Sequence, residues 1–113
     1  MLPPQNKWSN WYRFPGNGSE LYLIAPFGPG VYELRNQANN KLVYCGASKN
    51  VASRMSSLLP KPIGTGRRNN MLLRQYVDEN LKDIEYRTKA SVCRKTAKKE
   101  ERNMHNNYKY LFV

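Results

Sequence analysis

Two neighbouring stretches in which apolar and polar residues alternate constrain the fold of this chain most strongly. Residues 30–35 read Gly-Val-Tyr-Glu-Leu-Arg, residues 36–40 have the composition of a turn, and residues 41–46 read Lys-Leu-Val-Tyr-Cys-Gly. A side-chain period of two is typical of a half-buried strand, and a short polar connection makes the two strands antiparallel. The sequence therefore predicts a β-hairpin.

Further elements are expected after the hairpin. Apolar residues at helical spacing predict a helix that starts near residue 51 and ends at Pro60 and Pro62, a second helix over about 67–80, a third strand over 83–88 and a last helix over about 92–107. The second helix owes its apolar stripe to Leu72, Leu73, Tyr76 and Val77. A chain of 113 residues has room for one domain. We expect an α/β fold of order β-β-α-α-β-α, with a small three-stranded antiparallel sheet flanked by helices.

The first 28 residues differ from the rest in composition and are expected to form an arm, while residues 29–113 form the domain. Prolines and glycines interrupt this arm, yet four aromatic residues lie within seven positions of it. The simpler interpretation is that these aromatic rings pack over the domain, and the alternative is that some of them stack on nucleic acid bases. They are Trp8, Trp11, Tyr12 and Phe14.

The charge of the chain indicates a polyanionic partner. Nineteen Lys and Arg face eight Asp and Glu, a net charge of +11, and residues 48–113 hold 15 of the basic and six of the acidic side chains, a surplus of nine. No apolar segment approaches the roughly 20 residues of a membrane helix, and the first residues show no secretory signal. We expect the protein not to be secreted, and to reside in the nucleus if it is eukaryotic and otherwise in the cytoplasm.

The few soft ligands argue against two kinds of site. Two cysteines and one histidine favour neither a disulfide framework nor a structural zinc site. Cys45 and Cys93 are expected to be buried small residues. His105 could carry a proton or bind a metal, but a surface histidine is the simpler interpretation.

Two charged residues share the apolar faces of predicted helices. Arg54 falls in the stripe of Val51 and Met55, and Glu101 falls on the face of Ala97. A charge on such a face is costly unless it is paired or points into a site. Arg54 and Glu101 could pair with each other or with local polar groups. Alternatively, the arginine suits a phosphate and the glutamate a hard divalent cation.

These residues lie in a pattern that resembles the signature of the GIY-YIG nuclease domain family. The pattern consists of Gly30-Val31-Tyr32, then Tyr44-Cys45-Gly46, then Arg54, and finally a helix in which Ala97 precedes Glu101 by one turn. It covers residues 29–113. The resemblance implies a small α/β domain with a three-stranded antiparallel sheet that cuts DNA with one divalent metal ion, Mg²⁺ or Mn²⁺.

The resemblance also implies a role for each residue of the pattern. Tyr32 would be the general base or orient the attacking water, and Tyr44 would position the nucleophile and the phosphate. Arg54 would stabilise the transition-state charge, and Glu101 would hold the metal. The sequence departs from the family at Leu58, where a His or Tyr is common, and at Val113, where an Asn is common.

The expected partner is DNA, duplex or branched, with RNA not excluded, and further domains or partner proteins are possible. The departures leave open a second function, a catalytically weakened DNA-binding module on the same fold, as in some plant transcription effectors that this stretch resembles. A protein-interaction domain is a third and weaker alternative. The side chains expected to contact the phosphate backbone are Lys49, Arg67, Arg68, Arg74, Lys95, Lys98, Lys99 and Arg102, although such charges also commonly cover solvated surfaces.

Overall fold

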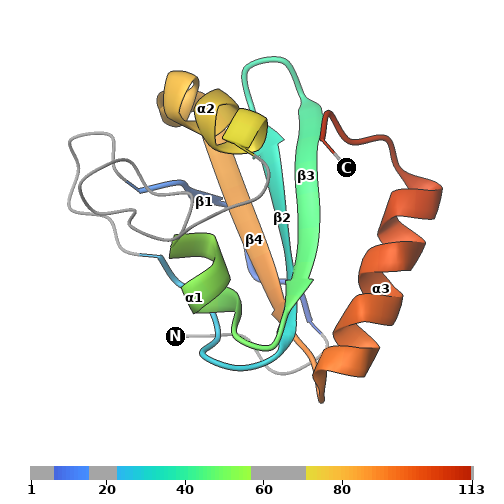
Figure 1. Cartoon of the computed structure of the whole chain (residues 1–113). Helices are drawn as coiled ribbons and strands as arrows, with labels where there is room; N and C mark the ends of the chain where they lie inside the picture. Colours follow the sequence, from blue (N-terminus) through green and yellow to red (C-terminus); the bar gives the residue numbers. More distant parts are fainter. Residues whose placement is uncertain (1–6, 16–22, 57–70, 113) are drawn as a thin grey trace.

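A four-stranded antiparallel sheet forms the centre of the molecule (Figure 1). The computed structural model describes residues 7–15, 23–56 and 71–112. The strand order in the sheet is β1-β4-β2-β3, and all three neighbouring pairs are antiparallel. The described elements are β1 (Tyr12–Arg13), β2 (Gly30–Asn36), β3 (Lys41–Ser48), α1 (Val51–Ser56), α2 (Met71–Glu79), a 3₁₀ turn (Leu81–Asp83), β4 (Ile84–Ala90) and α3 (Arg94–Asn107).

The central hairpin confirms the prediction from alternation. β2 and β3 pair from Gly30 opposite Ser48 to Asn36 opposite Lys41, so both strands extend slightly beyond the predicted limits. The register shifts once, between Leu34 and Arg35. In the turn, Asn40 has a φ of 58°, a left-handed conformation that asparagine tolerates better than most residues.

The expected sheet of three strands is wrong by one strand. β1 pairs with β4, with Tyr12 opposite Tyr86 and Arg13 opposite Glu85, and it forms one edge of the sheet. A strand of two residues has no alternation to detect, because its conformation comes from pairing with a distant strand. The predicted third strand also shifts, since Asp83 belongs to the 3₁₀ turn and β4 runs on to Ala90.

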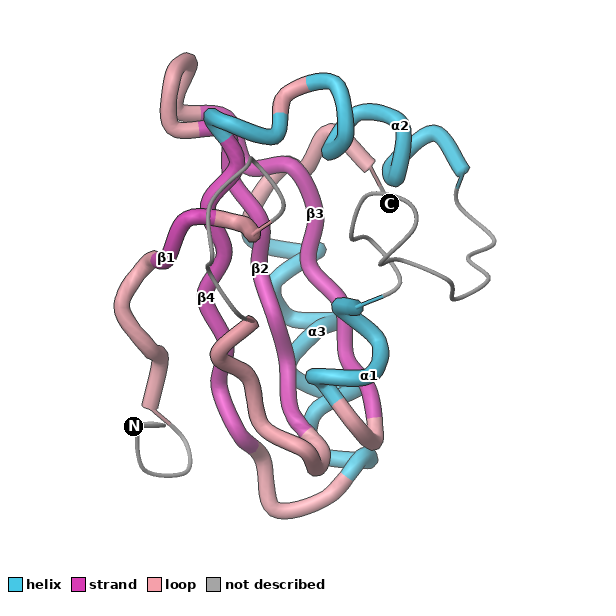
Figure 2. Tube along the Cα trace, turned by 90° about the vertical axis from the view of Figure 1, so that its left-hand side faces the viewer, coloured by secondary structure: helices cyan, strands magenta, loops and turns pink. Residues whose placement is uncertain are grey.

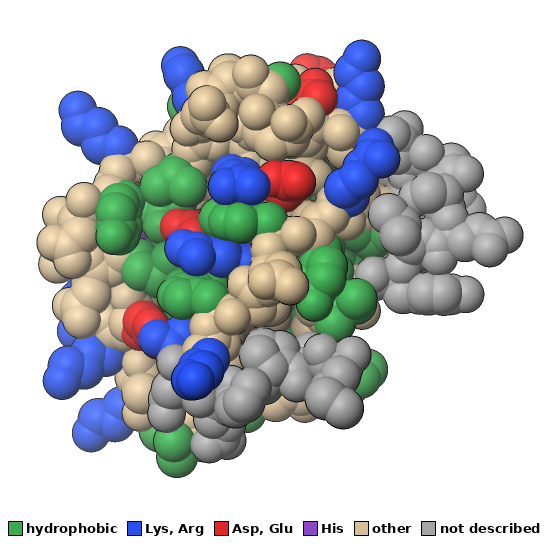
Figure 3. Space-filling model, turned by 180° about the vertical axis from the view of Figure 1, so that it is seen from behind, with side chains coloured by type: hydrophobic (Ala, Val, Ile, Leu, Met, Phe, Trp, Pro, Cys, Tyr) green, Lys and Arg blue, Asp and Glu red, His purple; other side chains and the backbone are tan. Residues whose placement is uncertain are grey.

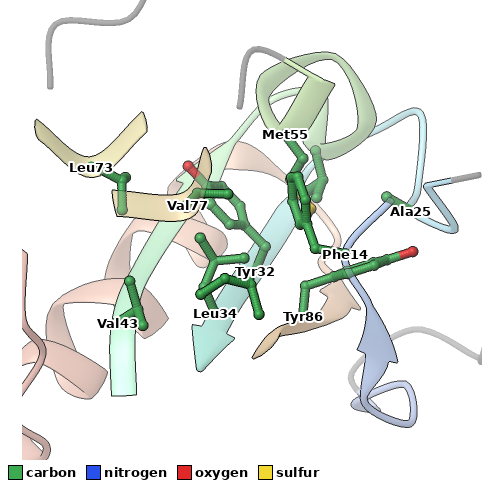
Figure 4. Close-up of a cluster of buried hydrophobic side chains, with 11 residues drawn as sticks. Phe14, Ala25, Tyr32, Leu34, Val43, Met55, Leu73, Val77 and Tyr86 are labelled. Atoms are coloured by element: carbon green, nitrogen blue, oxygen red, sulfur yellow. The ribbon is translucent and has the colours of Figure 1, made fainter. Parts of the chain in front are cut away.

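The core lies on the face of the sheet that α1 and α2 cover (Figure 4). Tyr32, Leu34 and Tyr86 point into it from the central strands. Phe14 and Ala25, from the predicted arm, are buried in the same cluster, with Tyr12 packed against it. The other buried members are Val43, Val51, Met55, Leu73, Val77 and Ile84. The interpretation that the arm's aromatic residues pack on the domain is therefore confirmed for Phe14 and Tyr12.

Ion pairs and tryptophan rings occupy the opposite face of the sheet. The Arg87 guanidinium lies 2.7 Å from Glu33 Oε1, and that of Arg35 lies 2.7 Å from Glu85 Oε1. The ring of Trp11 contacts both guanidinium groups, at 4.1 Å from Arg35 and 4.7 Å from Arg87. Figure 3 shows acidic, basic and apolar side chains interleaved on the back of the molecule. These cation–π contacts hold the arm against the sheet.

The helices begin close to where the spacing placed them. α1 starts at Val51 and α2 is described from Met71, whereas residues 57–70, with Leu58, Leu59, Pro60 and Pro62, lie outside the described residues. Leu72 is exposed and not part of the buried stripe of α2. α3 packs on β3 and β2, on the face of the sheet opposite to α1 (Figure 2). In the described part of the chain, we find no helix with the length and apolar character of a membrane span.

Candidate functional site

A basic pocket of about 300 Å³ lies at the end of β3. The strand contributes Ala47 and Ser48, and the turn that follows contributes Lys49. Figure 1 shows the end of β3, α1 and the start of α3 at the same end of the sheet. The cationic side chains that line the pocket are Lys49, Arg54, Arg94 and Lys98. The pocket is therefore suited to an anion.

Glu101 lies beside this pocket and is tied to its wall. The backbone N–H of Ala47 donates a hydrogen bond to Glu101 Oε2 at 3.2 Å. The other oxygen, Oε1, lies 3.9 Å from Lys98 Nζ, one turn earlier on α3. The glutamate is half-buried, so the prediction that it lies on the packing side of its helix is confirmed. Its neighbour Glu100 instead pairs with Lys89, which leaves Glu101 as the carboxylate beside the pocket.

Arg54 lies at the pocket but is not buried. The expectation that it shares the inward stripe of α1 is wrong, because the described helix has six residues and buries only Val51 and Met55. Arg54 is exposed and lines the pocket. A long side chain near the edge of an apolar stripe can carry its charged group out to solvent. Arg54 therefore lines the pocket, and Glu101 lies beside it through its hydrogen bond to Ala47.

The two tyrosines of the sequence pattern lie side by side on the hairpin. Their ring centroids are 6.1 Å apart. Tyr44 is half-buried, whereas Tyr32 is only 1% exposed and belongs to the core. Gly46 lies directly opposite Tyr32, and a Cβ atom there would be 2.5 Å from the tyrosine hydroxyl. The glycine of Tyr-Cys-Gly therefore makes room for the Tyr32 phenol.

His105 packs against β3 and is not the surface histidine that the sequence favoured. Its Nε2 atom lies 3.2 Å from Cys45 Sγ and 3.2 Å from the Cys45 carbonyl oxygen. Its ring stands edge-on to those of Tyr44 and Tyr110, with centroids at 6.3 and 5.2 Å. The histidine therefore supports the strand that carries Tyr44.

The two cysteines have opposite environments. Cys45 is buried, as predicted, and burial raises the pKa of its thiol to about 12. Cys93 is exposed, so the expectation of a second buried cysteine is wrong. It is the N-cap residue of α3, and its hydrogen bond with Thr96 lowers the pKa of its thiol. The helical spacing predicted that Cys93 lies on the apolar face of the last helix. α3 begins at Arg94, so Cys93 precedes the helix and does not share its buried face.

A buried carboxylate in the middle of β2 escaped the sequence analysis. Glu33 is 2% exposed, and it accepts hydrogen bonds from Arg87 and from the Tyr110 hydroxyl. Burial and the hydrogen bond to Glu33 raise the pKa of Tyr110. Alternation correctly put Glu33 on the face away from Tyr32, but no local pattern shows that the segment after α3 covers that face.

The other side chains expected to contact phosphate occupy several places. Lys49 and Lys98 line the pocket, while Lys95, Lys99 and Arg102 are exposed on α3. Arg74 is half-buried on α2, and Arg67 and Arg68 lie outside the described residues. Arg94, which begins the same basic run on α3, also lines the pocket.

The residues beside the pocket fit a divalent cation that takes one ligand from the protein and others from a bound phosphate. Within the described ranges, no three His, Cys, Asp or Glu side chains come close enough together to form a metal site. Glu101 offers carboxylate oxygens, which are hard ligands. Mg²⁺ commonly binds proteins through one or two carboxylates and completes its shell with water and substrate phosphate. This single carboxylate therefore suits a divalent cation that takes its remaining ligands from water and a phosphate, and not one held by protein ligands alone.

Comparison with known protein families places the pocket within a recognised domain. The model of the GIY-YIG catalytic domain matches residues 28–110, a range that includes every pocket residue. No curated protein and no solved structure matches the chain.

Proposed function

The chain belongs to the GIY-YIG catalytic domain family, and on this premise we propose that it is a metal-dependent endonuclease that hydrolyses DNA phosphodiester bonds. One observation carries the proposal. Arg54 lines the basic pocket, and Glu101, 47 residues later in the chain, is hydrogen-bonded to Ala47, another residue that lines it. Phosphodiester hydrolysis needs an activated water and stabilisation of charge on the phosphate oxygens. Arginine suits the second need, and a metal held by the glutamate would serve both.

The charged residues of the pocket divide the work. Glu101 would hold Mg²⁺ or Mn²⁺, which when bound supplies charge stabilisation to the phosphate and the leaving oxygen. Arg54 donates hydrogen bonds to the non-bridging oxygens, since its planar fork matches the geometry of a phosphate. The Ala47 N–H keeps the Glu101 carboxylate in place through its hydrogen bond to Oε2.

The tyrosines position the water and the phosphate. A phenol has a pKa of about 10, so at neutral pH it is a poor base without a cation nearby. Tyr44 is half-buried and supplies an accessible phenol on β3. Tyr32, in the core, acts as the general base or orients water through its hydroxyl, which lies over Gly46.

The substrate is DNA, duplex or branched. Exposed cations on α3 extend the basic surface away from the pocket along the helix and contact further phosphates. They are Lys95, Lys99 and Arg102. RNA carries the same phosphates, and the contacts proposed here are not base-specific.

A cleavage assay tests the proposal. Plasmid and branched DNA are incubated with the protein in Mg²⁺, in Mn²⁺ and in EDTA, alongside Arg54→Ala and Glu101→Ala. We expect products with either metal, none in EDTA, and strong losses in both variants. Cleavage that survives both substitutions would contradict the assignment.

The burial of Tyr32 favours a second candidate function. A phenol that is 1% exposed has little access to a substrate water, and Leu58 stands where the family often has a His or Tyr. These features are consistent with a DNA-binding module that has lost most of its catalysis and serves in transcription regulation. Binding with a steep salt dependence and no products in either metal would support this candidate.

A further inference from the structure

The basic pocket has two separate cationic walls. Lys49 and Arg54 form one wall, after the end of β3. Arg94 and Lys98 form the other wall, from the start of α3. Positions four residues apart on a helix project from the same face, so the second pair acts from one direction. Both of its side chains are open to solvent, since Arg94 is exposed and the Lys98 side chain is 48% exposed.

The charge of the pocket exceeds what one phosphate needs. Four cationic side chains and one adjacent carboxylate leave an excess of three positive charges before any metal binds. A phosphodiester carries one negative charge. Among the described residues, a single scissile phosphate would therefore offset one of these three excess charges. A strand that places two phosphates at the pocket balances that charge better.

The helix also separates the two positions in space. Arg94 precedes Glu101 by seven residues, which corresponds to about 10 Å along the helix axis. This axial spacing is long enough for a phosphate next to Glu101 and a neighbouring phosphate of the same strand at the Arg94 end of the wall. Lys98 lies between them in the sequence, with its Nζ 3.9 Å from Glu101 Oε1.

We infer that Arg94, assisted by Lys98, binds the phosphate next to the scissile one and fixes the register of the DNA strand in the pocket. The inference rests on the proposed function for the identity of the scissile phosphate. Arg94 is a positioning residue in this account, because it holds the strand and does not touch the reacting atoms.

The test measures binding and cleavage separately with the full chain. Binding to a fluorescent DNA duplex is measured in EDTA at several salt concentrations for the wild type, Arg94→Gln, Arg54→Gln and Lys41→Gln. Lys41 is an exposed cation at the far end of β3 and serves as the matched control. We expect Arg94→Gln to weaken binding by about tenfold at low salt and to reduce the slope of log K against log salt by about 0.9. Lys41→Gln should behave as the wild type does.

A scan with neutral phosphates identifies the contact. Duplexes that carry a single methylphosphonate are compared, moving the modification along one strand. With the modification at one position, Arg94→Gln should bind the duplex as tightly as the wild type binds it. With the modification at the neighbouring position, the same should hold for Arg54→Gln. The inference is overturned if the same modified position abolishes the affinity loss of both Arg94→Gln and Arg54→Gln. It is also overturned if Arg94→Gln binds unmodified DNA as tightly as Lys41→Gln does.

The inference and the proposed function can fail independently. Binding that follows this pattern without any cleavage supports the role of Arg94 and contradicts the nuclease. Metal-dependent cleavage at an unchanged site and rate in Arg94→Gln, with unchanged binding, contradicts the role of Arg94 and supports the nuclease. Circular dichroism verifies that each variant is folded, which we expect because Arg94 is an exposed residue in the first turn of α3.

Discussion

The backbone N–H of Ala47 donates a hydrogen bond to the carboxylate of Glu101, at 3.2 Å from Oε2. This contact joins the end of β3 to α3, two elements that lie far apart in the sequence. The donor is a backbone group with a fixed position, so it holds Oε2 in place. The other oxygen, Oε1, lies 3.9 Å from Lys98 Nζ. The position of the proposed metal ligand therefore depends on the hairpin.

Gly46→Ala should destabilise the protein. The new Cβ would lie 2.5 Å from the Tyr32 hydroxyl and 2.6 Å from its ring carbon Cζ, and the buried ring has little room to move. Overpacking of this kind costs about 1–3 kcal/mol in the free energy of unfolding. Urea denaturation measures the change. Gly28→Ala is the control, because nothing lies within 4 Å of a Cβ at that position, and an equal loss in both variants would contradict the account.

Phe14→Ala tests whether the predicted arm belongs to the core. Phe14 is 1% exposed and stands edge-on to Tyr86, with ring centroids 5.9 Å apart. Removing a buried phenylalanine costs about 3–5 kcal/mol. The same substitution at Phe27, which is 84% exposed, should leave the free energy of unfolding nearly unchanged. If the two variants have the same stability, the core does not include the arm.

The sequence predicted the hairpin and the helices because their signals are local. Alternation over residues 30–46 marks β2 and β3, and the 3.6-residue spacing places Glu101 on the packing side of α3. β1 could not be predicted, since two residues carry no period and its conformation depends on pairing with β4. The position of His105 against Cys45 likewise depends on how α3 packs on β3.

The candidate site was predictable only where its residues belong to a local sequence pattern. The pattern named Arg54 and Glu101, and the structure has both beside one pocket. It did not reveal that Arg54 is exposed, because a helix with only two buried residues tolerates a long charged side chain at the edge of its stripe. The burial of Glu33 needs the segment after α3 to cover the sheet, and no spacing in the sequence carries that information.

The two thiols should differ sharply in reactivity. The thiolate is the reactive form, so a lowered pKa makes Cys93 reactive, while Cys45, with a pKa of about 12, stays protonated through neutral pH. With a disulfide reagent at pH 8 we expect one thiol to react quickly in the folded protein and the second only after unfolding. The rate for Cys93 should rise with pH and reach half its maximum below pH 9.0.

The variant Cys93→Ser serves as the control for this assay. It should show no fast-reacting thiol in the native state. A fast thiol in Cys93→Ser would mean that Cys45 is accessible, in conflict with its burial.

Lys98→Met should increase the affinity of the free protein for Mn²⁺. Lys98 Nζ lies 3.9 Å from Glu101 Oε1, so the lysine competes with a cation for this carboxylate. The pair is partly exposed and weak, and its loss should raise the affinity by about two- to fivefold in calorimetry without DNA. Lys99→Met removes the same charge from an exposed position on α3. An equal gain in both variants, or none in Lys98→Met, would contradict direct competition.

Single-turnover cleavage by Glu101→Gln, measured together with its DNA affinity, tests the central claim most directly. Glutamine keeps a carbonyl oxygen that can accept the Ala47 N–H but removes the charge that would hold the metal. With Mg²⁺ or Mn²⁺ at saturation we expect the cleavage rate to fall at least about a hundredfold while the affinity for DNA in EDTA is not weakened. A rate equal to that of the wild type would contradict the account.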